Sequence, residues 1–580
     1  MKIYASSFPP LSIPHESVVT YLTRTRFDEF PRHRPAFTDA ETGKTITRGE
    51  FRDMLLSMGW GLRHELAKRG GVQLQRGDVV MILSPNSLAW PVMLFGGFAA
   101  GLRMTLANSA YTPREVLHQW TDSKAKAVLV HPSLLPVLLE TFKLLDLSFT
   151  DAKRKIIVAD WGLPPQSSFN DYITMSDILG KGSLAEEEKY TGEQANETAL
   201  LCYSSGTTGK PKGVETTHRN LVSVIAMVGV GFPNLHEPNP TMLGVLPFYH
   251  IYGCVKILQF PFSRGMRTVI MSRFNPVEFC RAIERYAVTQ ALIVPPMCLV
   301  LAHSPAVDKF NLKSLRIMFS GAAPLGGPLV TALRNRLLQV GADVFISQGY
   351  GLTETSPTTH LLGTEDCLRK VGWVGPLLPN LEARLVIEDV EDAKEGEPGE
   401  LWVRGPSIMK GYWNNKEATK NSITPDGWFK TGDIAIRDAE GHYAIVDRRK
   451  ELIKYKGFQE MNISKRDLVV PPAELESVLL QHPDIVDAAV IGIVSEQQAT
   501  ELPRAYVVHA RGIKPEEHKA FGQEVQEWIK SRVARHKFLR GGVVVVDSVP
   551  KSAAGKILRR ELRERAKVEV EAESKLKAKL

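Results

Sequence analysis

Residues 203–213 combine small, hydroxylated and glycine residues with two lysines, a pattern suited to binding a polyphosphate. The run reads Tyr-Ser-Ser-Gly-Thr-Thr-Gly-Lys-Pro-Lys-Gly. Glycines let backbone N–H groups approach an anion, hydroxyls add donors, and Lys210 and Lys212 neutralise charge. A Walker A loop would need glycine in place of Ser204 and a hydroxylated residue in place of Pro211. A flexible linker is the structural alternative, but linkers seldom follow an apolar stretch such as 198–202.

The segments around this loop follow the pattern of a parallel sheet covered by helices. Apolar runs at 292–294, 315–319 and 344–346 predict strands, and they alternate with predicted helices at 297–302 and 328–340. Two polar segments, beginning at Ser320 and Gln348, start where a predicted strand ends. Because ligands of such sheets bind at the carboxyl ends of the strands, we expect both segments at the functional site.

The length of 580 residues exceeds what one hydrophobic core supports and predicts at least two domains. After about Asp447 the pattern changes to charged hairpin segments, a helix at 472–480 and strands at 488–493 and 504–508. The predicted fold is therefore α/β, with a large N-terminal domain of helix-covered sheets and a smaller α+β C-terminal domain. The expected bounds are 1–447, 448–565 and a charged tail, 566–580.

Composition argues against several other classes. The five cysteines show no C-x-x-C spacing, which favours a reduced compartment and implies no zinc site. The net charge is +8, but the lysines and arginines are dispersed among 64 acidic residues except at the C-terminus, so we expect the charge to attract small polyanions and not nucleic acid. The N-terminus lacks the apolar core of a signal peptide. The longest apolar run, 88–102, is shorter than the roughly 20 residues that span a bilayer, so it predicts a buried helix and no transmembrane segment.

The loop at 203–213 resembles the phosphate loop of the acyl-adenylate-forming enzymes, and other motifs of that family follow in order. Segment 246–253 is similar to the acyl-pocket motif, 320–326 to the adenine loop and 348–357 to the nucleotide and magnesium motif. Further along, similar segments are the ribose contact (431–433), the hinge (447–459) and the catalytic-lysine loop (550–556). The residues at 250–253 and 454–459 are most similar to those of the 4-coumarate:CoA ligase-like branch.

The resemblance implies an ATP-dependent carboxylate:CoA ligase that uses ATP, Mg²⁺ and CoA. It would form an acyl-adenylate and pyrophosphate, and then an acyl-CoA thioester and AMP. The sequence leaves the acid open between an aromatic propenoate and a medium-chain or oxylipin acid. Two alternatives stay open as well: an adenylating enzyme that serves a non-CoA acceptor, and a non-catalytic AMP-binding protein.

By the same resemblance, Glu354 is expected to bind magnesium, Thr353 the α-phosphate and Asp433 the ribose, with Arg448 beside it, while adenine stacks on Tyr350. The structural alternatives are a solvated loop acid for Glu354, a packing residue for Tyr350 and a common turn for Asp433. The residues expected to contact ATP are Ser204, Ser205, Gly206, Thr207, Thr208, Gly209, Lys210, Lys212, Gly321, Ala322, Ala323, Pro324, Gln348, Gly349, Tyr350, Gly351, Thr353, Asp433 and Arg448.

The resemblance also assigns two roles to the C-terminal domain as a mobile lid. Lys556 would catalyse adenylation, and after rotation about the hinge residue Lys450, Lys454 would serve thioester formation. We expect a solvated side chain for Lys551. The expected CoA tunnel contains Lys454, Lys456 and Gly457, the catalytic set is Lys556, Lys454, His250 and Thr353, and the acyl pocket contains His250, Tyr252, Met297, Ala322, Gly351 and Pro357. A satisfied core histidine is the alternative for His250.

Two segments stand apart from the motifs. Residues 460–469 separate Gln459 from the helix signal in a place where family members run on directly, so they indicate a neutral loop, a gene-model artefact or a loop near CoA. The final Ala578-Lys579-Leu580 resembles the C-terminal peroxisomal signal, which predicts a peroxisomal import receptor as partner and the peroxisome, or otherwise the cytoplasm, as location.

Overall fold

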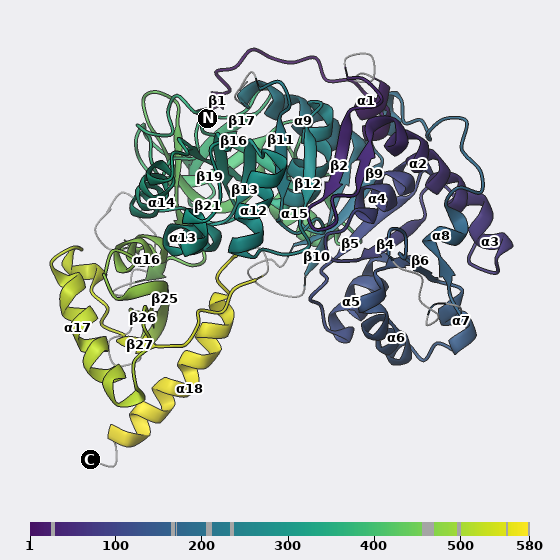
Figure 1. Ribbon diagram of the computed structural model, residues 1–580. Coiled ribbons are helices and arrows are strands. Elements are labelled where there is room, and N and C mark those ends of the chain that lie inside the picture. The colour runs from purple at the N-terminus through teal and green to yellow at the C-terminus, as the bar shows by residue number, and fades with distance from the viewer. Residues whose placement is uncertain are drawn as a thin grey trace.

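The computed structural model describes residues 1–24, 30–163, 169, 171–204, 211–232, 237–454, 469–495, 500–552 and 555–577. Figure 1 shows a large body made by the N-terminal three quarters of the chain and a smaller body of α16, α17, α18 and β25–β27 below it. The two are joined shortly after β22 (Tyr443–Arg448).

The first large sheet contains the predicted β-α alternation. Strands β11, β12, β13, β14, β15 and β2 run parallel, and β16 and β3 pair antiparallel at the two edges. The order is β16 (Thr358–Leu361), β15 (Phe345–Gly351), β14 (Ile317–Ser320), β13 (Gln290–Ile293), β11 (Thr241–Gly244), β12 (Arg267–Ile270), β2 (Pro35–Asp39) and β3 (Thr45–Thr47). The helices between these strands include α12 (Pro276–Tyr286), α13 (Pro295–His303) and α14 (Gly327–Gln339). The strand predicted at 344–346 extends to Gly351 because β16 pairs with its polar end.

The second large sheet carries the start of the phosphate-loop segment. Its order is β20 (Gly411–Tyr412), β10 (Lys212–Thr217), β9 (Thr198–Ser204), β5 (Arg103–Ala107), β4 (Val79–Leu83), β6 (Ala127–Val130), β7 (Ile156–Val158) and β8 (Ile173–Thr174). Alternate residues of β4 enter two hydrophobic cores, Val80 and Ile82 on one face and Val79, Met81 and Leu83 on the other. The buried helix predicted at 88–102 is α4 (Ala89–Ala99), in which every residue is buried.

A third, antiparallel sheet was not anticipated from the sequence. It joins β1 (Tyr4–Ala5), β17 (Glu382–Ile387), β19 (Gly399–Arg404), β21 (Phe429–Arg437) and β22, with β18 (Glu391–Asp392) beside β17. The N-terminal strand pairs with a strand almost 380 residues away, a contact that no local pattern could indicate. The register of β21 and β22 places Asp433 opposite Arg448, so the two residues of the expected ribose contact are neighbours.

The C-terminal body is the predicted α+β domain with a core of its own. It contains β23 (Ile453–Lys454), β24 (Val469–Val470), α16 (Pro472–Leu479), β25 (Ile485–Ser495), β26 (Thr500–His509), α17 (His518–Lys530), β27 (Val543–Val545) and α18 (Arg559–Lys577). Strands β25 and β26 exceed the predicted lengths because they pair with each other over their whole extent. Helix α18 continues past residue 565, and Glu569 accepts hydrogen bonds from Arg504 and Tyr506. The start of the expected tail therefore packs on this domain, and the domain bounds stay a prediction.

Within the described ranges, no helix has both the length and the apolar character required to cross a lipid bilayer.

Candidate active site

The carboxyl ends of β14 and β15 begin the site. Their register places Ser320 beside Gln348, so the two polar segments predicted at strand ends do lie side by side. The Gln348 side chain accepts a hydrogen bond from the Leu325 N–H at 3.1 Å and donates one to the Leu325 carbonyl at 3.2 Å. Gln348 was expected to contact ATP, but its amide is already used to fix the backbone of the loop that follows β14.

Two glycines in this region allow close backbone approach. A Cβ at Gly351 would clash with the Pro357 carbonyl, and one at Gly321 would lie 3.1 Å from the Tyr252 ring. The residue after Gly321, Ala322, adopts a left-handed φ of 67°. The Tyr252 hydroxyl donates to the Phe319 carbonyl at 3.4 Å, which ties the acyl-pocket motif to the adenine loop.

The Glu354 carboxylate joins the two large sheets. One of its oxygens, Oε1, accepts hydrogen bonds from Ser204 Oγ at 3.0 Å and from the Tyr412 hydroxyl at 2.9 Å. Ser204 ends β9 and Tyr412 lies in β20, so a residue after β15 is held by two strands of the other sheet. Glu354 is buried and is not the solvated loop acid of the structural alternative. Sequence reasoning missed Tyr412, for which no motif gave a signal.

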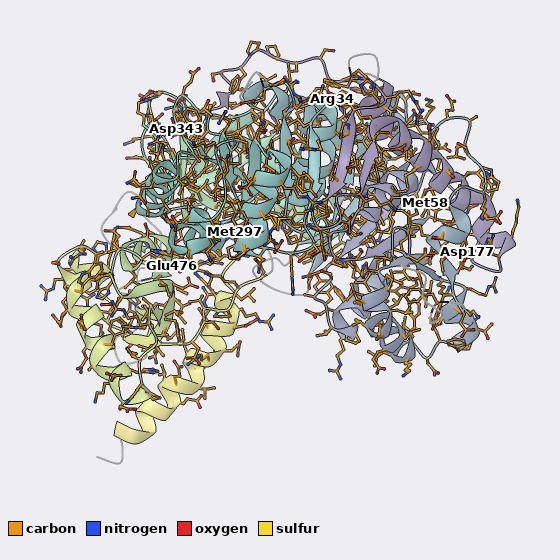
Figure 2. The ribbon with its side chains drawn as sticks, in the orientation of Figure 1. Arg34, Met58, Asp177, Met297, Asp343 and Glu476 are labelled. Carbon is orange, nitrogen blue, oxygen red and sulfur yellow. The ribbon has the colours of Figure 1, made fainter. Side chains whose placement is uncertain are left out.

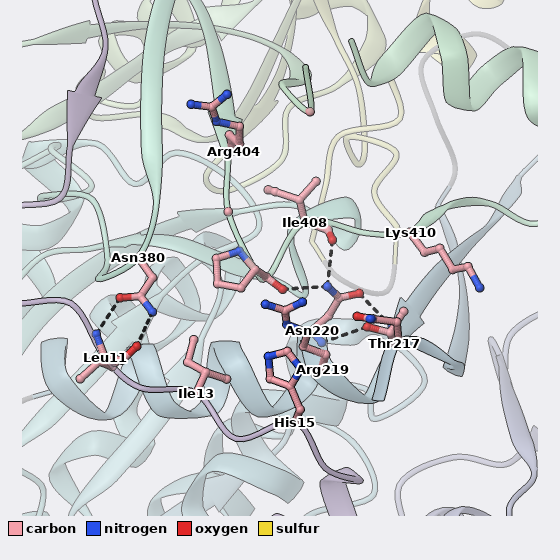
Figure 3. A pocket seen from close by; sticks show the side chains of 14 residues that line it. Leu11, Ile13, His15, Thr217, Arg219, Asn220, Asn380, Arg404, Ile408 and Lys410 are labelled. Atoms are coloured by element: carbon pink, nitrogen blue, oxygen red, sulfur yellow. Dashed lines mark hydrogen bonds between the residues drawn. The ribbon is translucent and has the colours of Figure 1, made fainter. Parts of the chain in front are cut away.

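The loop beside Glu354 is anchored from behind by Asn220, near the start of helix α9 (His218–Gly231). Its side-chain nitrogen donates to the carbonyls of Pro406 and Ile408 (Figure 3). The next residue, Met409, donates its N–H to the Glu354 carbonyl. The pocket in Figure 3 has a volume of about 770 Å³, but none of its described lining residues is among those expected to contact ATP or the acid. This pocket is therefore separate from the predicted ATP and acid contacts.

The expected ribose contact is organised by Tyr350. The Tyr350 hydroxyl donates to Asp433 Oδ2 at 2.6 Å, and Arg448 Nε lies 3.6 Å from Asp433 Oδ1. Burial raises the pKa of the Asp433 carboxyl, while the Arg448 charge opposes this shift. Tyr350 was expected only to stack on adenine, and its hydroxyl bond to Asp433 is an additional function of the side chain.

Lys556 enters from the C-terminal domain and faces the same charges. Burial lowers the pKa of Lys556 to about 8, and the Arg448 charge acts in the same direction. The carboxylates of Glu451, Asp433 and Glu354 oppose this shift. The neighbouring Lys551 is not solvated as expected, because its ammonium binds both carboxylate oxygens of Asp487 at 2.7 and 2.8 Å.

The Lys556 loop lies against α13 of the large body. A Cβ at Gly555, whose φ is 78°, would lie 3.2 Å from Pro296 and Val294. Met297 lies at this junction in Figure 2, and it lines a cavity of about 380 Å³ together with Lys551 and Ser552. Met297 therefore contacts a space shared by both domains.

His250 lies close to Lys556 and is uncharged. Its Nδ1 accepts the Tyr252 N–H at 3.3 Å, which places the ring proton on Nε2. Burial lowers the pKa of His250 to about 4, and the Lys556 charge adds to the effect. The ring is thus uncharged near neutral pH and presents a donor.

Comparisons with known proteins identify the family of this chain. Residues 23–413 match the AMP-binding enzyme family, and residues 474–556 match the AMP-binding enzyme C-terminal domain. This chain belongs to the AMP-binding enzyme family. It is an acid–CoA ligase of the 4-coumarate–CoA ligase-like group.

Two relatives and two solved structures illustrate the family match. The probable 4-coumarate–CoA ligase 1 of Dictyostelium discoideum is 34% identical over 97% of both chains. The 4-coumarate–CoA ligase 2 of Oryza sativa subsp. japonica is 37% identical, covering 97% of this chain and 94% of the relative. A benzoate CoA ligase from Burkholderia xenovorans has a TM-score of 0.77 at 25% identity, covering 94% of this chain and 99% of that one. The o-succinylbenzoate CoA synthetase of Bacillus subtilis, in complex with its acyl-adenylate intermediate, has a TM-score of 0.74 at 25% identity, covering 95% and 99%.

Among the described residues, the Glu354 carboxylate fits the chemistry of a Mg²⁺ ligand. Magnesium is usually held by one or two carboxylates together with substrate phosphates, and not by a cage of protein ligands. Glu354 fits this pattern, since both hydrogen bonds to its carboxylate use Oε1. Among the described residues, no group of three or more acidic, histidine or cysteine side chains could hold a metal ion.

Several expected residues are not tested by the geometry. Those that lie outside the described residues are Ser205, Gly206, Thr207, Thr208, Gly209, Lys210, Lys456, Gly457, most of the 460–469 segment and Ala578-Lys579-Leu580. Thr353 starts a short 3₁₀ helix and is half-buried, whereas Lys450 is exposed in the turn after β22. The backbone of Lys454 pairs with Val469. The roles of these residues, and the peroxisomal location, stay predictions.

The pKa of Lys556 predicts how adenylation depends on pH. The Lys556 amine is protonated and charged below its pKa of about 8 and neutral above it. His250, with a pKa of about 4, is neutral over the same pH range. We expect kcat/KM for pyrophosphate release to be flat from about pH 6 to 7.5 and then to fall about tenfold per pH unit above 8. Lys556→Arg should move the fall beyond pH 9, because a guanidinium stays charged. An unchanged midpoint in this variant would exclude Lys556 as the titrating group.

Proposed function

We propose that this enzyme is an ATP-dependent carboxylate:CoA ligase acting on an aromatic propenoate or a medium-chain carboxylic acid. It forms an acyl-adenylate and pyrophosphate, and then an acyl-CoA thioester and AMP. The observation that carries the proposal is the meeting of Lys556, Asp433 and Glu354 at one end of the sheets, although they lie in three distant segments. The names of the relatives support CoA as the acceptor and aromatic acids among the substrates.

In the first step the protein holds two anions together and stabilises charge on the α-phosphate. Asp433 accepts the ribose hydroxyls while Tyr350 and Arg448 orient it. The Lys556 ammonium lies where the acid carboxylate and the α-phosphate meet, and Thr353 donates to the phosphate. Glu354 would hold Mg²⁺, and the bound ion would supply positive charge near the pyrophosphate oxygens.

In the second step the C-terminal domain rotates about Lys450 and presents the segment that begins at Lys454. Lys454, Lys456 and Gly457 then line the path of the CoA thiol to the acyl-adenylate. The exposure of Lys450, in a short turn between the two bodies, is consistent with a hinge at this position. Removing Lys556 from the site opens the space that the thiol needs.

A two-stage assay tests this function. Pyrophosphate release is measured with a panel of aromatic propenoates and medium-chain acids, and thioester formation on addition of CoA is then followed by mass spectrometry. We expect ATP-dependent pyrophosphate release with at least one acid and a CoA-dependent thioester of the same acid. Adenylation without a thioester would favour the non-CoA acceptor, and ATP binding without pyrophosphate release would favour a non-catalytic protein.

A further inference from the structure

A buried lysine in the large domain has no role in the reaction described above. Lys256 lies in the π-helical turn Cys254–Gln259, four residues after Tyr252, and is only 4% exposed. Within the described part of the chain, its Nζ has no hydrogen-bond partner. An acceptor in the same turn, Gln259 Oε1, is also unpartnered, so the two side chains do not satisfy each other. Unpaired buried ammonium groups are costly, and they point to a missing partner.

The surroundings of Lys256 are aromatic. Its Nζ lies 5.6 Å from the centre of the Phe232 ring and 4.9 Å from that of Phe260. Ring faces compensate only part of the lost hydration of an ammonium. Burial lowers the pKa of Lys256 to about 7, so the amine is only partly charged near neutral pH, and an anion beside it would favour the charged form.

A chain of contacts connects Lys256 with the wall of the acyl pocket. Phe232 packs on Phe319 at a ring distance of 4.7 Å. The Phe319 carbonyl accepts the Tyr252 hydroxyl, and the Tyr252 ring lies against Gly321. Lys256 therefore lies beside the aromatic residues Phe232 and Phe319, the second of which directly precedes the adenine loop, and it is only four residues beyond Tyr252. An acid whose reacting carboxylate is at the Lys556 end would extend its other end toward this wall.

Resting on the proposed function, we propose that Lys256 is a specificity-determining residue whose ammonium binds a second carboxylate at the far end of the acid. The substrate class is then a dicarboxylic acid, aromatic or medium-chain, with an apolar middle that packs on Phe232 and Phe319. A carboxylate would supply both the charge and the hydrogen-bond acceptor that Lys256 lacks. An acid with a methyl end would leave the ammonium unpaired, which discriminates against it.

Matched pairs of acids test this inference. Adipate and hexanoate, suberate and octanoate, and 4-carboxycinnamate and cinnamate are compared by kcat/KM for pyrophosphate release. We expect the wild-type enzyme to prefer the dicarboxylate in at least one pair by about 100-fold. Lys256→Met, which keeps the length of the side chain without its charge, should remove or invert this preference. Its Tm should equal or exceed that of the wild type, because a buried unpaired charge is replaced by an apolar group.

Lys143→Met is the matched control, since it removes one lysine charge from a side chain that is 75% exposed. It should leave the preference unchanged. Equal rates with both members of every pair, or the same preference in Lys256→Met as in the wild type, would overturn the inference while leaving the ligase function intact. A preference for 4-hydroxycinnamate over both cinnamate and 4-carboxycinnamate would overturn the dicarboxylate class. Absence of pyrophosphate release with any acid would instead refute the ligase function on which the inference rests.

Discussion

Replacing Lys556 with alanine should lower the rate of acyl-adenylate formation about 1,000-fold, because it removes the mobile positive charge nearest the reacting phosphate. The same variant should convert supplied acyl-adenylate into thioester at close to the wild-type rate, since the proposed rotation of the domain would take Lys556 out of the site. Pyrophosphate release measures the first half-reaction, and thioester formation from synthetic acyl-adenylate and CoA measures the second.

Lys454→Ala is the counterpart and should show the reverse pattern, with adenylation retained and the CoA step lost. Lys551→Met serves as a structural comparison, because the Lys551 ammonium is paired with Asp487 of the same domain. If Lys556→Ala and Lys454→Ala each impaired both half-reactions to the same degree, a lid with two working orientations would be excluded for this enzyme.

Changing Glu354 to glutamine should reduce adenylation about 100-fold and raise the Mg²⁺ concentration needed for half-maximal rate. The amide oxygen of glutamine can still accept hydrogen bonds from Ser204 and Tyr412, so the loop should keep its position. The negative charge that would hold the cation is lost, however. The measurement is pyrophosphate release as a function of Mg²⁺ at saturating ATP.

Tyr412→Phe is the control for this experiment, because it removes one hydrogen bond to Glu354 and keeps the carboxylate. It should cost no more than about tenfold in rate and leave the Mg²⁺ dependence near that of the wild type. A Mg²⁺ dependence that shifts equally in both variants would mean that Glu354 acts by positioning the loop and not by holding the cation.

Local patterns in the sequence determined a large part of the architecture. The apolar runs that predicted strands near 292, 317 and 345 correspond to β13, β14 and β15, and the continuous apolar run at 88–102 corresponds to the buried helix α4. These predictions succeed because hydrophobic periodicity and chain polarity act over a few residues. The same reasoning placed Ser320 and Gln348 at strand ends, and their register confirms that they are neighbours.

Only the tertiary structure decided which side chains meet. The bonds of Tyr350 to Asp433 and of Tyr412 to Glu354 join strands of different sheets, and the positions in the sequence carry no signal for such pairs. Lys551 and Lys556 look alike in the sequence, yet one binds Asp487 and the other faces the site charges. In the sequence Lys256 looks like an ordinary helical lysine, but in the fold its ammonium lies near the rings of Phe232 and Phe260. Burial and charge pairing depend on groups brought together from distant segments, so they are settled by the packing of the whole chain and not by local sequence.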